Sequence, residues 1–155
     1  MLYWEHNPEA RLPLKYKYRQ NTLRDLYPTY CELVTDTCNQ LLEILELKSW
    51  SIDIIFEDFS KSKDEDPDSP AFAETSPEPE YSQANMTFFL KSMADRPIDG
   101  PTTVKTVIHE WVHVWLSPYM VPAAMIHPEH EKLLQHMEER LVCQMSELDF
   151  WFELF

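Results

Sequence analysis

The chain has 155 residues, of which 44% are hydrophobic and 26% charged, so it is long enough for one domain with a hydrophobic core and too short for two. Lysine and arginine total 13 against 27 aspartates and glutamates, which gives a formal net charge of -14. This acidity argues against general binding to nucleic-acid phosphates. No apolar run approaches the roughly 18 to 20 residues that span a bilayer, and the first residues lack the pattern of a secretory signal. We therefore expect a cytoplasmic protein that binds neither nucleic acid nor membrane.

The first part of the chain predicts a helix and then a strand. Leucine, tyrosine and valine recur at helical spacing over 21–47, which predicts a helix there, although Pro28 falls early enough to mark its true first turn. Residues 50–59 alternate apolar and polar side chains, which is the period of a strand. Residues 1–20 are irregular, and we expect an exposed strand or tail. Two cysteines seven residues apart in the helix, Cys31 and Cys38, are expected to lie in the core.

The middle of the chain is acidic and rich in proline. Residues 57–80 hold nine acidic residues, two lysines and four prolines. A segment of this composition does not bury enough apolar surface to pack in a core, so we expect a mobile acidic surface loop over about 57–80. Alternation resumes at 81–90, which predicts a second strand, and 91–101 is expected to be a turn region.

Two helices are predicted in the last third. A broad apolar face indicates a largely buried helix over 102–116, which Ser117-Pro118 is expected to end. A last helix is predicted from Pro128 towards Phe155. Its expected inner side consists of Leu133, Leu134, Met137, Leu141, Met145 and Leu148. The order helix, strand, long loop, strand, helix, helix predicts a single small α+β domain over residues 1–155.

The buried helix carries His109-Glu110-Trp111-Val112-His113, which is an HExxH motif. Residues four apart lie on one helix face, so both imidazoles can reach one ion. Glu110 is rotated by roughly 100° and stands beside that ion. Two histidines and a glutamate on an otherwise apolar helix are costly unless they are paired or bind a metal. The alternatives are hydrogen-bonded core histidines and a structural zinc site.

A catalytic zinc needs a third protein ligand. The metzincin pattern HExxHxxGxxH fails, because Leu116 and Tyr119 occupy its glycine and third-histidine positions. An acid on the last helix remains. Glu139 follows His113 by 26 residues, which leaves room for a loop and about three turns of a returning helix. We prefer Glu139, with Glu138 as the alternative. The remaining candidates are Glu131, His127, His130 and His136.

VIHEWVH followed by EERLV resembles the minimal zincin metallopeptidases of the gluzincin type, in the style of ImmA/IrrE-type and SprT-like domains. In that family a helix packed on a short sheet precedes the HExxH helix, and a following helix carries a glutamate ligand. A small or branched apolar residue commonly stands three positions after that ligand, as Val142 does after Glu139. Two departures stand out. Cys143 occupies a position where many relatives have Asp or Asn, and the long acidic segment is not part of the usual pattern.

The resemblance implies a zinc-dependent metallopeptidase. It implies that zinc held by His109, His113 and Glu139 activates a water, with Glu110 as the general base, and Tyr119 is a candidate oxyanion donor. We expect a protein or peptide substrate, basic if charge steers it, that pairs with strand 81–90. The alternative function is an acidic binding protein that mimics nucleic acid or inhibits a basic partner, with a relic or structural metal site.

Overall fold

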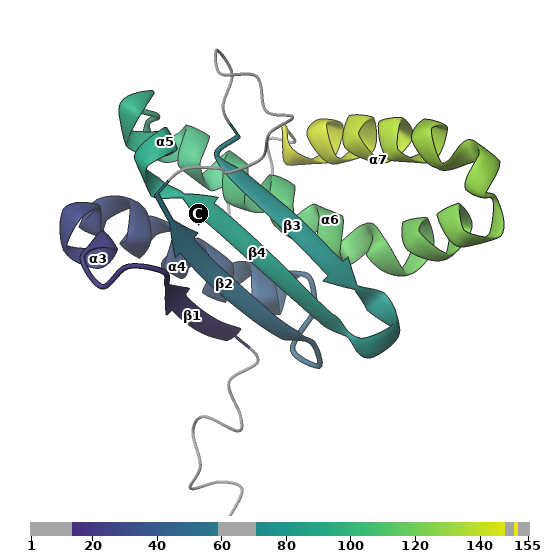
Figure 1. The fold of residues 1–155 in the computed structure, drawn as a ribbon, viewed down its shortest axis with the longest axis horizontal. Coiled ribbons are helices and arrows are strands. Elements are labelled where there is room, and N and C mark those ends of the chain that lie inside the picture. The colour runs from purple at the N-terminus through teal and green to yellow at the C-terminus, as the bar shows by residue number, and fades with distance from the viewer. Residues whose placement is uncertain (1–13, 59–70, 148–150, 152–155) are drawn as a thin grey trace, which may run out of the picture.

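Four strands form one mixed sheet in the order β1-β2-β4-β3 (Figure 1). They span Leu14–Tyr18 (β1), Ser51–Glu57 (β2), Ala73–Glu78 (β3) and Gln83–Phe89 (β4). β2 pairs in parallel with β1 and β4, whereas β3 runs antiparallel to β4. The computed structural model describes residues 14–58, 71–147 and 151. Within them the protein is an α+β fold, as the sequence predicts.

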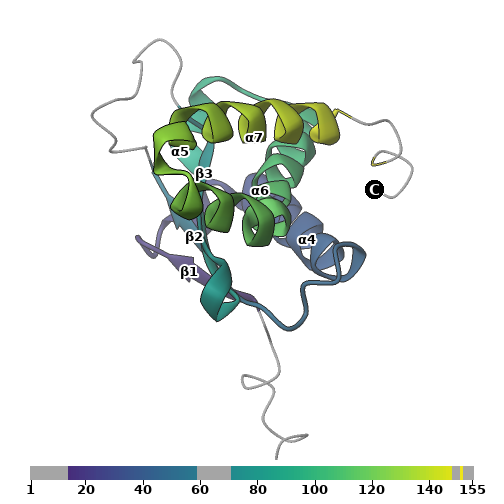
Figure 2. The same cartoon turned by 90° about the vertical axis from the view of Figure 1, so that its right-hand side faces the viewer.

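Two long helices lie on one side of this sheet. α4 and α6 pack behind the strands, and α7 folds back along α6 (Figures 1 and 2). The helices are α3 (Leu23–Leu26), α4 (Pro28–Ile44), α5 (Leu90–Asp95), α6 (Gly100–Ile126) and α7 (Glu131–Ser146), with short 3-10 turns at Pro79–Tyr81 (η1) and Pro128–His130 (η2). In the described ranges, no helix is both long and apolar enough to cross a membrane.

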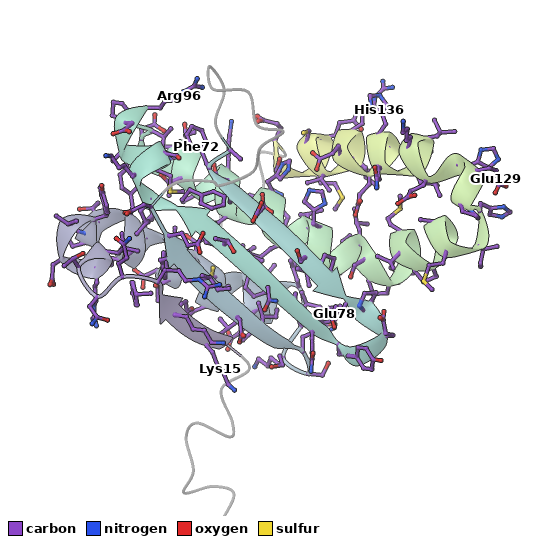
Figure 3. The ribbon with its side chains drawn as sticks, viewed as in Figure 1. Lys15, Phe72, Glu78, Arg96, Glu129 and His136 are labelled. Atoms are coloured by element: carbon purple, nitrogen blue, oxygen red, sulfur yellow. The ribbon has the colours of Figure 1, made fainter. Side chains whose placement is uncertain are left out.

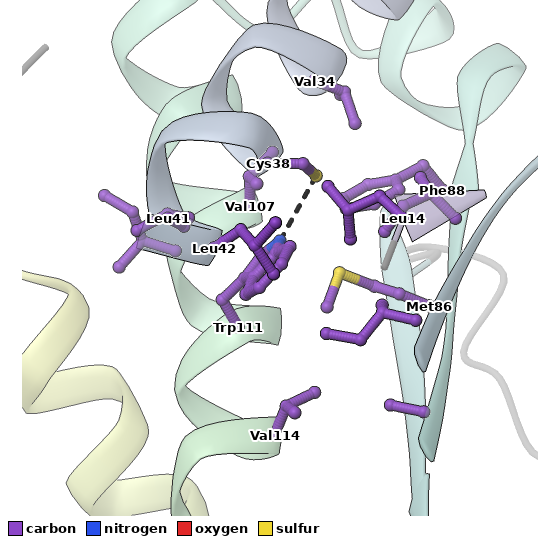
Figure 4. Close-up of a cluster of buried hydrophobic side chains, with 14 of the residues drawn as sticks. Leu14, Val34, Cys38, Leu41, Leu42, Met86, Phe88, Val107, Trp111 and Val114 are labelled. Atoms are coloured by element: carbon purple, nitrogen blue, oxygen red, sulfur yellow. Dashed lines mark hydrogen bonds between the residues drawn. The ribbon is translucent and has the colours of Figure 1, made fainter. Parts of the chain in front are cut away.

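The core lies between the sheet and the two helices behind it. The alternation of β2 buries Ile52, Ile54 and Phe56 completely, because side chains two apart point to the same face of a strand. Trp111 of α6 lies against α4, where its Nε1–H donates to Cys38 Sγ over 3.2 Å (Figure 4). The prediction of core cysteines is confirmed, and burial raises the pKa of the Cys38 thiol to about 12.

The acidic segment contains a strand that the sequence analysis missed. The expectation of a surface loop over 57–80 is wrong for Glu57, the last residue of β2, and for β3 at 73–78. Every second residue of β3 is exposed, and the others, Ala73, Thr75 and Pro77, are half-buried. An antiparallel strand can pack one face and expose the other to water, and β3, which is antiparallel to β4, does so with a largely polar sequence. Residues 59–70 lie outside the described residues.

Helix α6 continues ten residues beyond the predicted end at 116. Pro118 has no N–H for the carbonyl of Val114, which normally breaks a helix. The hydroxyl of Ser117 donates to that same carbonyl over 2.7 Å and so replaces the missing donor. At the other end, the Asp99 carboxylate accepts the Thr102 backbone N–H over 2.8 Å, and the helix begins before the predicted Thr102.

Other boundaries differ from the predictions in smaller ways. The predicted helix over 21–47 is divided at Tyr27 into α3 and α4, with Pro28 in the first turn of α4. The predicted turn region at 91–101 contains most of α5. For residues 1–20 we expected an exposed strand or a tail, and β1 at Leu14–Tyr18 is such a strand.

The inner side of α7 is rotated relative to the prediction. Leu133 is 56% exposed, and Met137 and Leu141 are exposed as well, so these three do not form the inner side. Leu134 and Met145 are half-buried and lie on the inner side as predicted, together with Glu138, Val142 and Ser146, which were not predicted there. Leu148 lies outside the described residues. This rotation brings the carboxylates of Glu138 and Glu139 next to His113 of α6.

Candidate metal centre

Helix α6 presents His109 and His113 on the side that faces α7. Their ring centroids are 5.0 Å apart and the ring planes are inclined by 70°. Both histidines are half-buried. The intervening Trp111 points into the core on the other side of the helix, so packing of the indole fixes the rotation of α6 that turns the imidazoles outward.

The antiparallel return of α7 brings Glu139 to both imidazoles. Glu139 Oε1 lies 2.7 Å from His113 Nε2, and Glu139 Oε2 lies 3.4 Å from His109 Nε2. One ligand atom from each of the three residues falls within 4.8 Å of the others. Ligands at zinc–nitrogen distances of about 2.0 Å in a tetrahedron stand roughly 3.3 Å apart. The three side chains therefore fit a zinc ion after small rotations.

The other ligand candidates are placed elsewhere. Among the described residues, the group able to hold a metal is His109, His113 and Glu139. His127 and His130 pair near η2, at the far end of the α6–α7 hairpin. His136 is exposed and points away from α6 (Figure 3). The arrangement favours Glu139 as the third ligand, as the sequence analysis preferred.

Glu138 has a different position from its neighbour. Its Oε1 lies 3.5 Å from Nδ1 of His113, on the opposite side of the ring from Glu139. A carboxylate beside the second ring nitrogen fixes the orientation and tautomer of a metal-binding histidine. Many members of the family that the chain resembles have Asp or Asn for this purpose at the position held here by Cys143, which is exposed. Glu138 is placed where such a carboxylate would stand, and its spacing of four from the buried Val142 is the sequence signal that puts it on the inner side of α7.

Glu110 is buried next to the two histidines and is not part of the three-ligand group. The residue is 6% exposed, and its carboxylate accepts a hydrogen bond from the Thr75 hydroxyl of β3. Burial raises the pKa of Glu110 to about 7, against the opposing effects of Thr75 and His113. A carboxyl with this pKa can both take and give a proton near neutral pH. Thr75 was missed in the sequence analysis because β3 itself was missed.

The two imidazoles have different proton affinities. Burial lowers the pKa of His109, and the charge of Glu139 only partly offsets it. Burial also disfavours protonation of His113, but the carboxylates of Glu138, Glu110 and Glu139 outweigh it and raise the pKa. A metal ligand must be a neutral imidazole, and these shifts make the neutral form easier to reach for His109 than for His113.

These side chains open onto a cavity of about 420 Å³ between β3, α6 and α7. It is lined by Ala73, Glu74, Thr75, Pro77, His109, Glu110, His113, Val121, Glu138 and Glu139. Tyr119 is not among the residues that line this cavity in the described part of the chain, and it is 73% exposed. The structure therefore does not bring the predicted oxyanion donor to the site.

The strand that lines the site is β3, whereas the predicted strand at 81–90 corresponds to β4. β4 is paired on both sides, with β2 and with β3, so the expectation that 81–90 offers an edge to a substrate is wrong. The Phe89 N–H donates to the Phe72 carbonyl over 2.9 Å. This bond makes Ala73 and Phe88 a non-hydrogen-bonded pair, so the backbone groups of Ala73 and Thr75 point to the free edge. Proline at 77 fits the same pattern, because an outward position needs no N–H.

Comparison with protein-family models, curated proteins and solved structures gave no match.

Proposed function

We propose that the protein is a zinc-dependent metallopeptidase of the zincin type. One observation carries the proposal. The imidazoles of His109 and His113 and the carboxylate of Glu139 converge on one point, and the buried carboxyl of Glu110 lies next to them without belonging to that group. Zinc in such a site lowers the pKa of a bound water and polarises the carbonyl of the substrate. The sequence resemblance to gluzincins and the order of the α+β elements support the same proposal.

In this proposal Glu110 moves the proton of the reaction. Its carboxylate takes a proton from the attacking water while the water oxygen bonds to the peptide carbonyl carbon. It then gives that proton to the leaving amine as the carbon–nitrogen bond breaks. A pKa of about 7 suits both halves of this task. Thr75 holds the carboxyl in place, and Glu138 keeps the His113 ring oriented.

The substrate of this proposal is an extended peptide lying along β3. The outward N–H and C=O groups of Ala73 and Thr75 can pair with it as an added strand. The metal site lies between two further hollows along α6, one sharing Val121 and Glu138 with it and the other sharing Ala73, His109 and Glu110. A groove that continues on both sides of the reacting centre favours cleavage inside a chain over removal of a terminal residue.

The test combines metal content with cleavage. The purified chain is expected to bind one zinc per molecule, and His109→Ala and His113→Ala should each lose it. Glu110→Gln should keep zinc while cleavage of a mixed peptide library falls by at least about 10²-fold, which is the usual contribution of a general base. His136→Ala is the matched control, because this exposed histidine on α7 should change neither zinc content nor cleavage. A Glu110→Gln variant as active as the parent, or a parent without zinc, would refute the proposal.

A further inference from the structure

A second hollow of about 390 Å³ adjoins the metal site between the ends of α6 and α7. Val121 and Glu138 line both spaces. The second hollow is lined by Met120, Val121, Ala124, Met125, Glu131, Leu134, Gln135 and Glu138. Five of these eight residues are apolar, which is the composition of a pocket that receives an apolar group.

The pocket is a consequence of the continuation of α6 beyond Pro118. Met120 and Ala124 follow His113 at seven and eleven residues, so they lie on the same helix face as the imidazole, two and three turns further on. On α7, Leu134 lies one turn before Glu138. Met120, Ala124 and Leu134 are only half-buried. The helix faces that carry the metal site thus continue directly into an apolar wall with room for a further group.

From this continuity we infer that the hollow is a specificity pocket that accepts a large apolar side chain of the substrate next to the cleaved bond. The inference depends on the proposed function and names its substrate class. Leucine, methionine and phenylalanine side chains match the lining, and the unbranched Met120 can adapt to their shape. Glu131 and Glu138 flank the pocket and disfavour acidic side chains there, since like charges repel.

The test uses the zinc-loaded full chain and two zinc-binding probes. Acetohydroxamate reaches the metal alone, while phenylalanine hydroxamate adds a large apolar group. We expect the parent to bind phenylalanine hydroxamate at least about tenfold more tightly than acetohydroxamate, because a pocket contact of this kind changes affinity by 10- to 200-fold. Ala124→Phe fills the pocket and should abolish this preference while zinc content and acetohydroxamate affinity stay unchanged.

Two further variants keep the inference testable if Ala124→Phe folds poorly. Leu134→Ala enlarges the pocket and should shift cleavage in a peptide library towards bulkier aromatic residues. Leu133→Ala removes the same side chain from the adjacent exposed position and should leave both preferences as in the parent. Zinc-loaded variants at 124 and 134 that keep the parental preferences would overturn the pocket inference alone. A parent that binds neither zinc nor hydroxamate would overturn the proposed function and the inference with it.

Discussion

Replacement of Glu110 by glutamine should stabilise the metal-free protein in alkaline solution. The Glu110 carboxylate is buried against the Thr75 hydroxyl, and burial raises its pKa from 4.5 to about 7. Because the folded state holds this proton more tightly than the unfolded state, stability falls as the pH rises from about 4.5 to about 7. Glutamine keeps an oxygen that accepts from Thr75 and carries no charge to desolvate.

The size of the effect follows from the pKa. A rise from 4.5 to about 7 corresponds to about 3 kcal/mol of stability lost once the carboxyl is fully ionised. Glu110→Gln should therefore match the parent near pH 4 and exceed its unfolding free energy by about 3 kcal/mol at pH 8. This gain is a substantial part of the 5–15 kcal/mol typical of a folded domain.

Urea unfolding of both proteins at pH 5, 6, 7 and 8 with excess chelator measures the difference directly. Glu74→Gln is the control, because it removes a charge from the lining of the same cavity at an exposed position. It should change stability by less than about 0.5 kcal/mol at every pH. A Glu110→Gln variant no more stable than the parent at pH 8 would show that the carboxyl is not buried as described.

Three further changes test other parts of the structure. Ser117→Ala should cost about 1–3 kcal/mol in urea unfolding, because it leaves the Val114 carbonyl of a buried helix without a donor; no loss would mean that Pro118 needs no compensation. Glu138→Gln should weaken zinc binding by about 10- to 100-fold in competition with a chelating dye, since it removes the charge beside His113. Phe56→Ala should cost about 3–5 kcal/mol at a fully buried position, and a cost below 1 kcal/mol would contradict the core described here.

The parts of the fold with strong periodicity could be predicted from the sequence. The alternation around Ile52–Phe56 and the helical spacing around Trp111 both encode burial on one face, so the strand and the buried helix were expected within a few residues. The HExxH spacing likewise predicted that His109 and His113 share a face. These features depend only on the period of a strand or a helix, and the spacing of apolar residues in the sequence shows that period directly.

The features that were missed depend on contacts between distant segments. β3 has a polar sequence because only one of its faces is packed, against α6 and the site. The continuation of α6 depends on a side-chain hydrogen bond from Ser117, which no helix propensity records. The rotation of α7 buries Val142 and brings Glu138 and Glu139 beside the two imidazoles, whereas the predicted inner side counted only leucine and methionine. The spacing of apolar residues along the sequence does not reveal such contacts.

The hydrogen bond between Thr75 and Glu110 joins the outermost strand of the sheet to the acid beside the metal site. Any chain segment that aligns against β3 would steady the strand that positions this acid. In the proposed reaction, docking and proton transfer would then be mechanically coupled, so that a small molecule too short to reach the strand would meet a less well-ordered base than a longer peptide. Full reactivity would in this way be reserved for ligands long enough to lie along the sheet.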